Sequence, residues 1–179
     1  MSQPHEPDPV KLISSLFSPE KELIEVAISE LSKIYGPLDR ISNELLFDRT
    51  RYYAREMGWP LHRRFISFLG LVPVDHLADI KLKTNEIERG YLRDGNRLLN
   101  IDPGLISPER LILATGKNYV HRIYLSKGIY ADLTLIYKRE SYRTLEWTYP
   151  DYADPDMIVW FNEVRKQYME QLREMKRLD

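Results

Sequence analysis

The chain has 179 residues, of which 30% are charged and 43% hydrophobic, and it contains no cysteine. The missing thiols exclude disulfide bonds, cysteine metal ligands and cysteine nucleophiles. Its 26 lysines and arginines nearly balance its 27 aspartates and glutamates, which disfavours binding that depends on neutralising many nucleic-acid phosphates.

The start of the chain carries three prolines in nine residues and no apolar periodicity. It lacks the basic and apolar regions of a signal peptide, and no later apolar run approaches the roughly 20 residues of a membrane-spanning helix. We therefore expect a flexible arm over residues 1–9, a single domain over residues 10–179, no membrane contact, and a cytoplasmic location.

Strand and helix patterns alternate over the first hundred residues. Strands are predicted where apolar residues run together, and helices where they recur every three or four positions behind a capping sequence. The predicted elements are a strand over Val10–Phe17, a helix that Ser18-Pro19-Glu20 starts and Gly36-Pro37 ends, strands at about 39–47 and 63–71, a helix from Val74 to about Arg93, and a strand over Arg97–Ile101 that Pro103-Gly104 would stop. This order is that of the ferredoxin-like βαββαβ unit.

The remaining part of the chain adds strands and one long helix to this unit. Ser107-Pro108-Glu109 repeats the earlier helix-start pattern and favours a short helix over Leu111–Thr115, although that apolar run also suits a strand. Further predicted elements are strands over Tyr119–Leu125, Ile129–Tyr137 and Tyr142–Trp147 and a final helix from Asp154-Pro155. We therefore predict an α+β fold, with a ferredoxin-like core, added antiparallel β-hairpin strands and a C-terminal helix.

Asn100 and Asp102 form the most specific polar feature, at the exit of a predicted strand. Because alternate residues of a strand share a face, their side chains would lie together. An amide beside a carboxylate can bind a hydroxyl, an amine or a metal-bound water. The alternative is turn chemistry, because an aspartate before Pro-Gly often caps a turn with its own side chain.

A second candidate segment contains Lys117, His121 and Arg122. His121 is the best acid–base candidate, and the two cations could clamp an anion. On a strand, Lys117 and His121 would face away from Arg122, so we expect them, rather than Arg122, to join Asp102. The alternatives are a hydrogen-bonded structural histidine and surface cations.

The second predicted helix carries Lys83, Asn85 and Glu88, which could face a pocket or simply water. A further cluster lies in the segment 48–64, where aromatic residues are interleaved with five arginines: Arg49, Arg51, Arg55, Arg63 and Arg64. Cations among aromatics suit a phosphate backbone with stacked bases. The alternative is a structured insertion with its aromatic rings packed inward.

Several familiar motifs are missing. The chain has no phosphate-binding G-x-x-x-x-G-K-[ST] loop, no His-Glu-x-x-His pair, no G-x-S-x-G elbow and no Rossmann glycines. The histidines show no metal-ligand spacing. The sequence thus predicts no metal site and leaves the cofactor unknown.

The whole chain resembles a family of bacterial and archaeal proteins, domain of unknown function 4416. The matching segments are Asp48…Tyr52-Tyr53…Glu56-Met57-Gly58, Ala78 to Glu88, Asn100-Ile101-Asp102-Pro103-Gly104, His121 to Leu125, Gly128-Ile129-Tyr130 and Trp147 to Tyr152. The resemblance implies a protein of about this length and carries no settled activity.

We expect a protein that binds an anionic metabolite or nucleotide and could act on it. Asp102 and His121 would be the acid–base pair, and the binding residues would be Lys83, Asn85, Asn100, Lys117 and Arg122. The competing hypothesis is a non-catalytic interaction module that contacts RNA or a protein partner through the segment 48–64.

Overall fold

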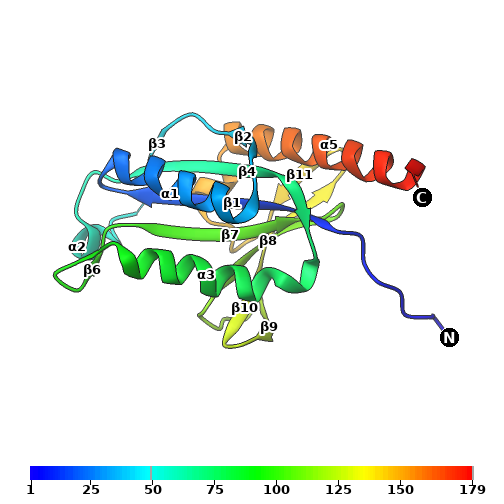
Figure 1. Cartoon of the computed structure of the whole chain (residues 1–179), viewed down its shortest axis with the longest axis horizontal. Helices are drawn as coiled ribbons and strands as arrows, with labels where there is room; N and C mark the ends of the chain where they lie inside the picture. Colours follow the sequence, from blue (N-terminus) through cyan, green and yellow to red (C-terminus); the bar gives the residue numbers. More distant parts are fainter. Residues whose placement is uncertain (49, 179) are drawn as a thin grey trace.

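The structure is a computed structural model that describes residues 1–48 and 50–178. Its first half contains β1 (Val10–Ser18), α1 (Lys21–Tyr35), β2 (Leu38–Ile41), β3 (Leu45–Leu46), α2 (Ala54–Met57), β4 (His62–Val72), the 3-10 turn η1 (Val74–His76) and α3 (Leu77–Gly90). Its second half contains β5 (Leu92–Arg93), β6 (Asn96–Arg97), β7 (Asn100–Ile106), β8 (Arg110–Thr115), β9 (Arg122–Ser126), β10 (Ile129–Lys138), β11 (Ser141–Thr144), α4 (Pro150–Ala153) and α5 (Pro155–Leu178). The predicted α+β class is confirmed (Figure 1).

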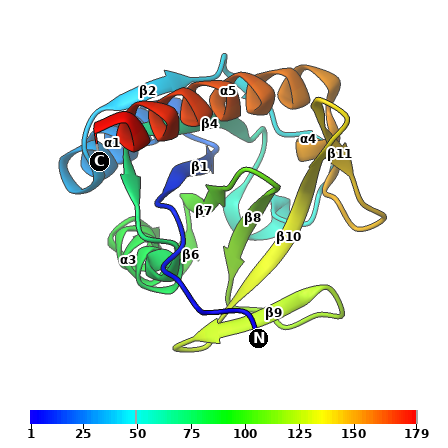
Figure 2. The ribbon, with the colours of Figure 1, turned by 90° about the vertical axis from the view of Figure 1, so that its right-hand side faces the viewer.

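Within residues 1–48 and 50–178, nine strands form one antiparallel sheet. Their order is β11-β10-β8-β7-β1-β4-β2, with β3 paired to β4 and β9 paired to β10. β5 and β6 form a separate small hairpin. One end of the sheet, β7-β1-β4-β2, holds the strands that α1 and α3 connect. β9 projects from the body of the protein at its edge of the sheet (Figure 2).

Alternation along the central strand β1 creates a core on each face of the sheet. Leu12 and Leu16 pack with α1 and α3, whereas Ile13 packs with α5. α3 and α5 accordingly lie on opposite sides of the strands in both views (Figures 1 and 2). A third cluster, which includes Phe17 and Met57, fills the end of β1 under α2. β1 and β7 are thus buried on both faces over most of their lengths.

The helix predicted over Leu111–Thr115 is wrong, because this segment is strand β8. Leu111 and Leu113 face the α5 core, while Ile112 and Ala114 face the α1 and α3 core. A strand that is buried on both faces has a continuous apolar run, so its periodicity resembles that of a buried helix. Ser107 closes a hairpin turn by donating its backbone N–H to the Arg110 carbonyl, at 2.9 Å.

Pro103-Gly104 does not end a strand or form a turn, contrary to the prediction, because β7 continues through both residues to Ile106. A Cβ atom on Gly104 would stand 2.6 Å from the Ile112 carbonyl oxygen and 2.7 Å from Leu113 Cδ2. The glycine is therefore required by the close approach of β8 rather than by a turn.

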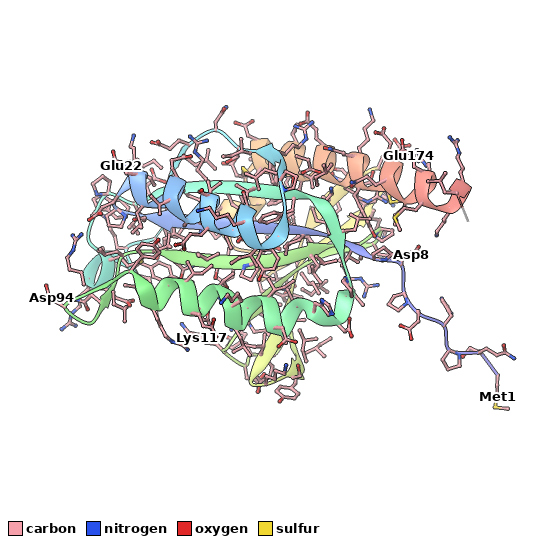
Figure 3. The ribbon with its side chains drawn as sticks, viewed as in Figure 1. Met1, Asp8, Glu22, Asp94, Lys117 and Glu174 are labelled. Carbon is pink, nitrogen blue, oxygen red and sulfur yellow. The ribbon has the colours of Figure 1, made fainter. Side chains whose placement is uncertain are left out.

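Residues 1–9 form no helix or strand and run away from the body of the protein (Figure 3). Asp8 forms an ion pair with Lys176 of α5, at 2.7 Å, and the Tyr168 hydroxyl donates to the Pro9 carbonyl. The flexible arm and the single domain over 10–179 stay predictions. Among residues 1–48 and 50–178, no helix is both long enough and apolar enough to cross a bilayer.

Candidate functional site

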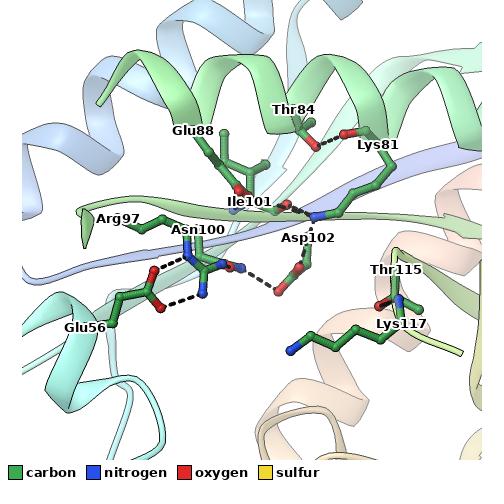
Figure 4. Close-up of polar contacts among 10 residues, drawn as sticks. All are labelled: Glu56, Lys81, Thr84, Glu88, Arg97, Asn100, Ile101, Asp102, Thr115 and Lys117. Carbon is green, nitrogen blue, oxygen red and sulfur yellow. Dashed lines mark hydrogen bonds and ion pairs between the residues drawn. The ribbon is translucent and has the colours of Figure 1, made fainter. Parts of the chain in front are cut away.

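β7 and β8 are paired only along part of their lengths in the described structure, from Gly104↔Leu113 to Ile106↔Leu111. Before Gly104, β7 pairs with β1 on one side, and side chains of α3 meet its other edge. The Ile101 N–H donates to Glu88 Oε1 at 2.6 Å, and Lys81 Nζ donates to the Ile101 carbonyl at 2.7 Å (Figure 4). We call this place the open start of β7.

α3 can place polar side chains at this edge of β7 because Lys81, Thr84 and Glu88 are spaced by three and four residues and share one face of the helix. They lie in the same buried stripe as Leu77 and Ile80. Thr84 Oγ1 donates back to the Lys81 carbonyl at 3.0 Å. The sequence contained this signal, since charged residues interrupt an apolar stripe. The prediction singled out Glu88 of this cluster, but it paired Glu88 with Lys83 and Asn85 rather than with Lys81 and Thr84.

The predicted binding residues of α3 lie away from this cluster or beside it. Lys83 is exposed and forms an ion pair with Glu86 at 2.9 Å on the outer face of the helix. Asn85 is half-buried. The third predicted polar residue, Glu88, does belong to the cluster.

Asp102 is the partly exposed carboxylate at the open start of β7. Its Oδ2 accepts from Asn100 Nδ2 at 2.8 Å, and its Oδ1 lies 3.4 Å from Lys81 Nζ. Asn100 Oδ1 in turn accepts from Arg97 Nη1 at 2.9 Å. The Asp102 side chain keeps 31% of its surface exposed, whereas Lys81 keeps 9%. The carboxylate is therefore fixed in orientation and still open to a ligand.

Arg97 is itself held by Glu56 of α2 through two parallel hydrogen bonds, of 2.7 and 2.8 Å. The hydrogen bond from Arg97 lowers the pKa of Glu56, and the same bond raises the pKa of Arg97. Such bidentate pairs are geometrically specific. A chain of hydrogen bonds thus runs from Glu56 through Arg97 and Asn100 to Asp102 (Figure 4).

Burial raises the pKa of Glu88 above its usual value, while the Lys81 ammonium, 3.9 Å away, acts in the opposite direction. The charge of Asp102 adds to the increase. Removal of water from a carboxyl group disfavours its charged form. Glu88 therefore holds its proton to a higher pH than an ordinary glutamate does.

Lys117 faces the cluster from the segment that follows β8. Its side chain is exposed and extends toward Asp102 (Figure 4), and its Nζ lies 5.5 Å from the centre of the Tyr52 ring. Its charge contributes to the lowered pKa of Glu56. Its backbone N–H donates to Thr115 Oγ1 at 3.2 Å. An exposed cation is thus directed toward the open carboxylate (Figure 4).

His121 and Arg122 form a neighbouring network around Asp132 of β10. His121 Nε2 lies 3.2 Å from Asp132 Oδ2, and Arg122 Nε donates to the same oxygen at 2.8 Å. The expectation that these two residues point to opposite sides is wrong, because β9 begins only at Arg122 and His121 lies in the preceding turn. The imidazole also stacks on Trp147, with ring centres 4.7 Å apart.

The Asp132 network borders the Asp102 cluster. Arg122 donates to the Lys117 carbonyl and to the Tyr149 hydroxyl, each at 3.0 Å. Burial raises the pKa of Tyr53 to about 12, and the nearby charges of Asp102 and Tyr149 add to the increase. Asp102 and His121 have separate partners in these two networks, and their role as one acid–base pair stays a prediction.

The described arginines of the segment 48–64 differ in exposure and do not all lie on the surface. Arg63 is buried, pairs with Asp151 at 2.7 Å, and lies 4.1 Å from the centre of the Phe47 ring. Arg64 donates to the Ser42 carbonyl, and Arg51 covers the Trp59 ring at 3.8 Å. Arg55 is exposed, and Arg49 lies outside the described residues. Arg63 and Arg64 are thus engaged in contacts within the protein, whereas Arg51 and Arg55 are exposed. Contact with RNA or a protein partner through this segment stays a prediction.

A hollow of about 280 Å³ lies elsewhere, beside β3 and the start of α5. Its polar lining includes Arg63 together with Asp48, Asp151, Asp154 and Asp156. The Arg63 cation is already paired with Asp151, and an anion entering the hollow would meet carboxylates on several sides. The balanced charges around Asp102 make the open start of β7 the better candidate site.

The fold and this site define an α+β sheet protein with a polar cluster where two neighbouring strands part. The chain belongs to the family described as Domain of unknown function (DUF4416), which it matches over residues 8–168. No curated protein and no solved structure matches it significantly. The family segments recognised in the sequence contribute Glu56, Lys81, Glu88, Asn100 and Asp102 to the cluster.

Proposed function

We propose that the protein binds a small anionic metabolite or nucleotide at the open start of β7. The observation that carries this proposal is the Asp102 carboxylate, which Asn100 and Lys81 hold in place and which stays partly exposed, with the Lys117 side chain directed toward it (Figure 4). Lys117 has no ion-pair partner within residues 1–48 and 50–178. A fixed acceptor next to an uncommitted cation suits a ligand with one anionic group and one hydrogen-bond donor.

Each side chain then has a chemical role. Lys117 meets the anionic group, and Arg122 holds the Lys117 backbone in place by donating to its carbonyl. Asp102 accepts a hydrogen bond from a ligand hydroxyl or amine, while Asn100 fixes its orientation and Asn85 borders the site. If the protein is an enzyme, Asp102 accepts the proton and His121 supplies one from the neighbouring network. Lys83 is left out, because it pairs with Glu86 on the outer face.

The proposal includes a ferredoxin-like core and a cytoplasmic location. The strand order β7-β1-β4-β2, with antiparallel neighbours and with α1 and α3 packed in one core, supports this core. The absence of cysteine agrees with a reducing compartment.

A thermal-shift screen against phosphorylated sugars and nucleotides tests the binding function. A ligand present at 100 times its dissociation constant adds about 2.7 kcal/mol to the free energy of unfolding, which is about 5–10 °C in melting temperature for a chain of this size. We expect at least one such compound to stabilise the protein, and a complete lack of response contradicts the proposal.

The position of the anion is tested with two lysine variants and the compound that stabilises the protein most. Lys117→Met should weaken binding about tenfold or more, because it removes the charge that meets the anion. Lys83→Met is the matched control, since it removes an exposed lysine from the outer face of α3. Equal affinities of the two variants in calorimetric titration would place the anion elsewhere.

A further inference from the structure

β9 is an edge strand of the large sheet, and its apolar side chains face solvent. It pairs with β10 on one side and, within residues 1–48 and 50–178, with no strand on the other. Ile123 of β9 is 70% exposed and Val120, in the turn before the strand, is 90% exposed, while Tyr119, Tyr124 and Leu125 are exposed as well. Such an edge offers unpaired backbone groups and apolar side chains to another strand.

The other edges of this sheet are protected, whereas β9 is not. β2 carries Asp39 and Arg40 within four residues, β11 carries Arg143, and β3 is only two residues long. Charged side chains and short edge strands hinder pairing with other chains. β9 has three apolar residues in succession, and its one charged residue, Arg122, is held by Asp132 of the same chain at 2.8 Å. Of these described edges, β9 is therefore the one open to a partner strand.

The sequence of β9 is complementary to itself in an antiparallel arrangement. When a second copy pairs with β9 about a two-fold axis at Tyr124, Ile123 opposes Leu125 of the second copy, and this apolar pair occurs twice. Tyr124 opposes its own counterpart, so two tyrosine rings meet on the other face of the strands. Directly opposed aromatic and β-branched side chains stabilise strand pairs. A two-fold interface of this kind is the commonest in homo-oligomers.

The charges around β9 permit the same arrangement. Lys127, in the turn that follows the strand, pairs with Asp79 of α3 at 2.5 Å, just as Arg122 pairs with Asp132. Both cations are thus neutralised within their own chain, and two copies that meet at Tyr124 bring no unpaired charges of this hairpin together. A peptide recognised by its charge would find no free counter-charge on β9, which favours an apolar strand such as β9 itself.

The exposed apolar surface is sufficient for a weak dimer. A biological interface buries about 1,000 Å² or more in total, which is about 500 Å² from each copy. Tyr119 and Tyr124, each more than half exposed, supply roughly 200 Å² of this. The three aliphatic residues and the strand backbone supply the rest. The interface therefore lies at the lower end of the size range, where association is transient.

We propose that β9 is the contact surface of a homodimer, in which the β9 strands of two copies pair antiparallel about Tyr124 and join two sheets into one. This inference is independent of the proposed function, because neither Lys117 nor Asp102 takes part in the pairing. The dimer should have a dissociation constant of about 10–100 µM.

Sedimentation velocity at protein concentrations from about 1 to 500 µM tests the association. The unmodified protein should change from monomer to dimer over this range. Ile123→Lys should raise the dissociation constant at least tenfold, because it sets a charge against Leu125 of the second copy. Its melting temperature should stay within about 2 °C of that of the unmodified protein, since the side chain is exposed.

Ile41→Lys is the matched control, because Ile41 is an exposed isoleucine of β2, at the opposite end of the sheet. This variant should dimerise like the unmodified protein. A monomer at all concentrations of the unmodified protein, or an equal loss of dimer in the two variants, overturns the proposal.

Single cysteines test the register, since the chain has no cysteine of its own. Tyr124→Cys places two cysteines directly opposite each other, where Cα atoms about 4.5–5.5 Å apart allow a disulfide. Ile123→Cys is the control in the same strand, because its counterpart in the second copy is displaced by two residues. With oxidised glutathione, Tyr124→Cys should form a covalent dimer much faster than Ile123→Cys. Equal rates, or no covalent dimer of Tyr124→Cys, overturn the pairing about Tyr124.

Discussion

Two lysine–aspartate pairs hold strands of the same sheet, and they differ in how completely they are closed. Lys11 of β1 donates to Asp39 at 2.5 Å and to the Phe68 carbonyl at 2.9 Å, and Ser67 donates to the other oxygen of Asp39. Both side chains are buried, with 0% and 4% of their surfaces exposed.

The pair formed by Lys81 and Asp102 has the same parts in a looser arrangement. Lys81 also donates to a strand carbonyl, that of Ile101, but its distance to Asp102 is 3.4 Å and the carboxylate is 31% exposed. The first pair satisfies its own charges and serves the fold. The second pair leaves carboxylate oxygens of Asp102 open to solvent as hydrogen-bond acceptors. A structural pair does not need such open acceptors, whereas a binding site does.

The largest expected effect comes from breaking the closed pair. Lys11→Met should lower the free energy of unfolding by about 3–5 kcal/mol, because it leaves the buried Asp39 carboxylate uncompensated. Lys81→Met should cost about 1–3 kcal/mol, since Asp102 can be solvated and Glu88 can take up a proton. Urea denaturation of both variants checks this order, and a greater loss for Lys81→Met would invalidate the contrast between the pairs.

The boundary between the closed and open parts of β7 can be tested at Gly104. Gly104→Ala should cost about 1–3 kcal/mol, because a methyl group would overlap the Ile112 carbonyl and the Leu113 side chain. Gly116→Ala is the control, since a Cβ there meets nothing within 4 Å, and it should stay within about 0.5 kcal/mol of the unmodified protein. Equal denaturation midpoints for the two variants would mean that β8 does not approach β7 this closely.

The smallest expected effect is a pH dependence at the open pair. The pKa of Glu88 is raised in the folded state above its ordinary 4.5, so its contribution to stability is complete below pH 4.5 and is lost as pH rises through the folded-state pKa. The stability advantage of the unmodified protein over Glu88→Gln should therefore shrink as pH increases above 4.5. Denaturation of both proteins over a pH series measures this, and a constant difference would show that the Glu88 pKa is not raised.

Local signals in the sequence account for much of the fold. The capping pattern at Ser18, the glycine after the first helix and the alternation around Phe65 place β1, α1 and β4 nearly where they lie. Asn100 and Asp102 share a face and form a hydrogen bond, as their spacing predicts. These features depend on neighbours within a few residues.

The features that the sequence did not predict depend on contacts between distant segments. Two cores meet at Leu111–Thr115, and they decide that this segment is a strand rather than a helix. The need for glycine at position 104 is explained only by the approach of β8. Lys81 was overlooked because its main partner is a backbone carbonyl twenty residues away. Likewise, His121 and Arg122 share one oxygen of Asp132 because a turn interrupts the alternation assumed for a strand.

The central claim is that Asp102 belongs to a binding site, whereas Asp39 belongs to the fold. The most direct measurement is the increase in melting temperature that the compound that stabilises the protein most causes in Asp102→Asn and in Asp39→Asn. Asp102→Asn should melt close to the unmodified protein and lose the ligand-induced increase, while Asp39→Asn should melt lower and keep it. A full ligand-induced increase in Asp102→Asn would contradict the account.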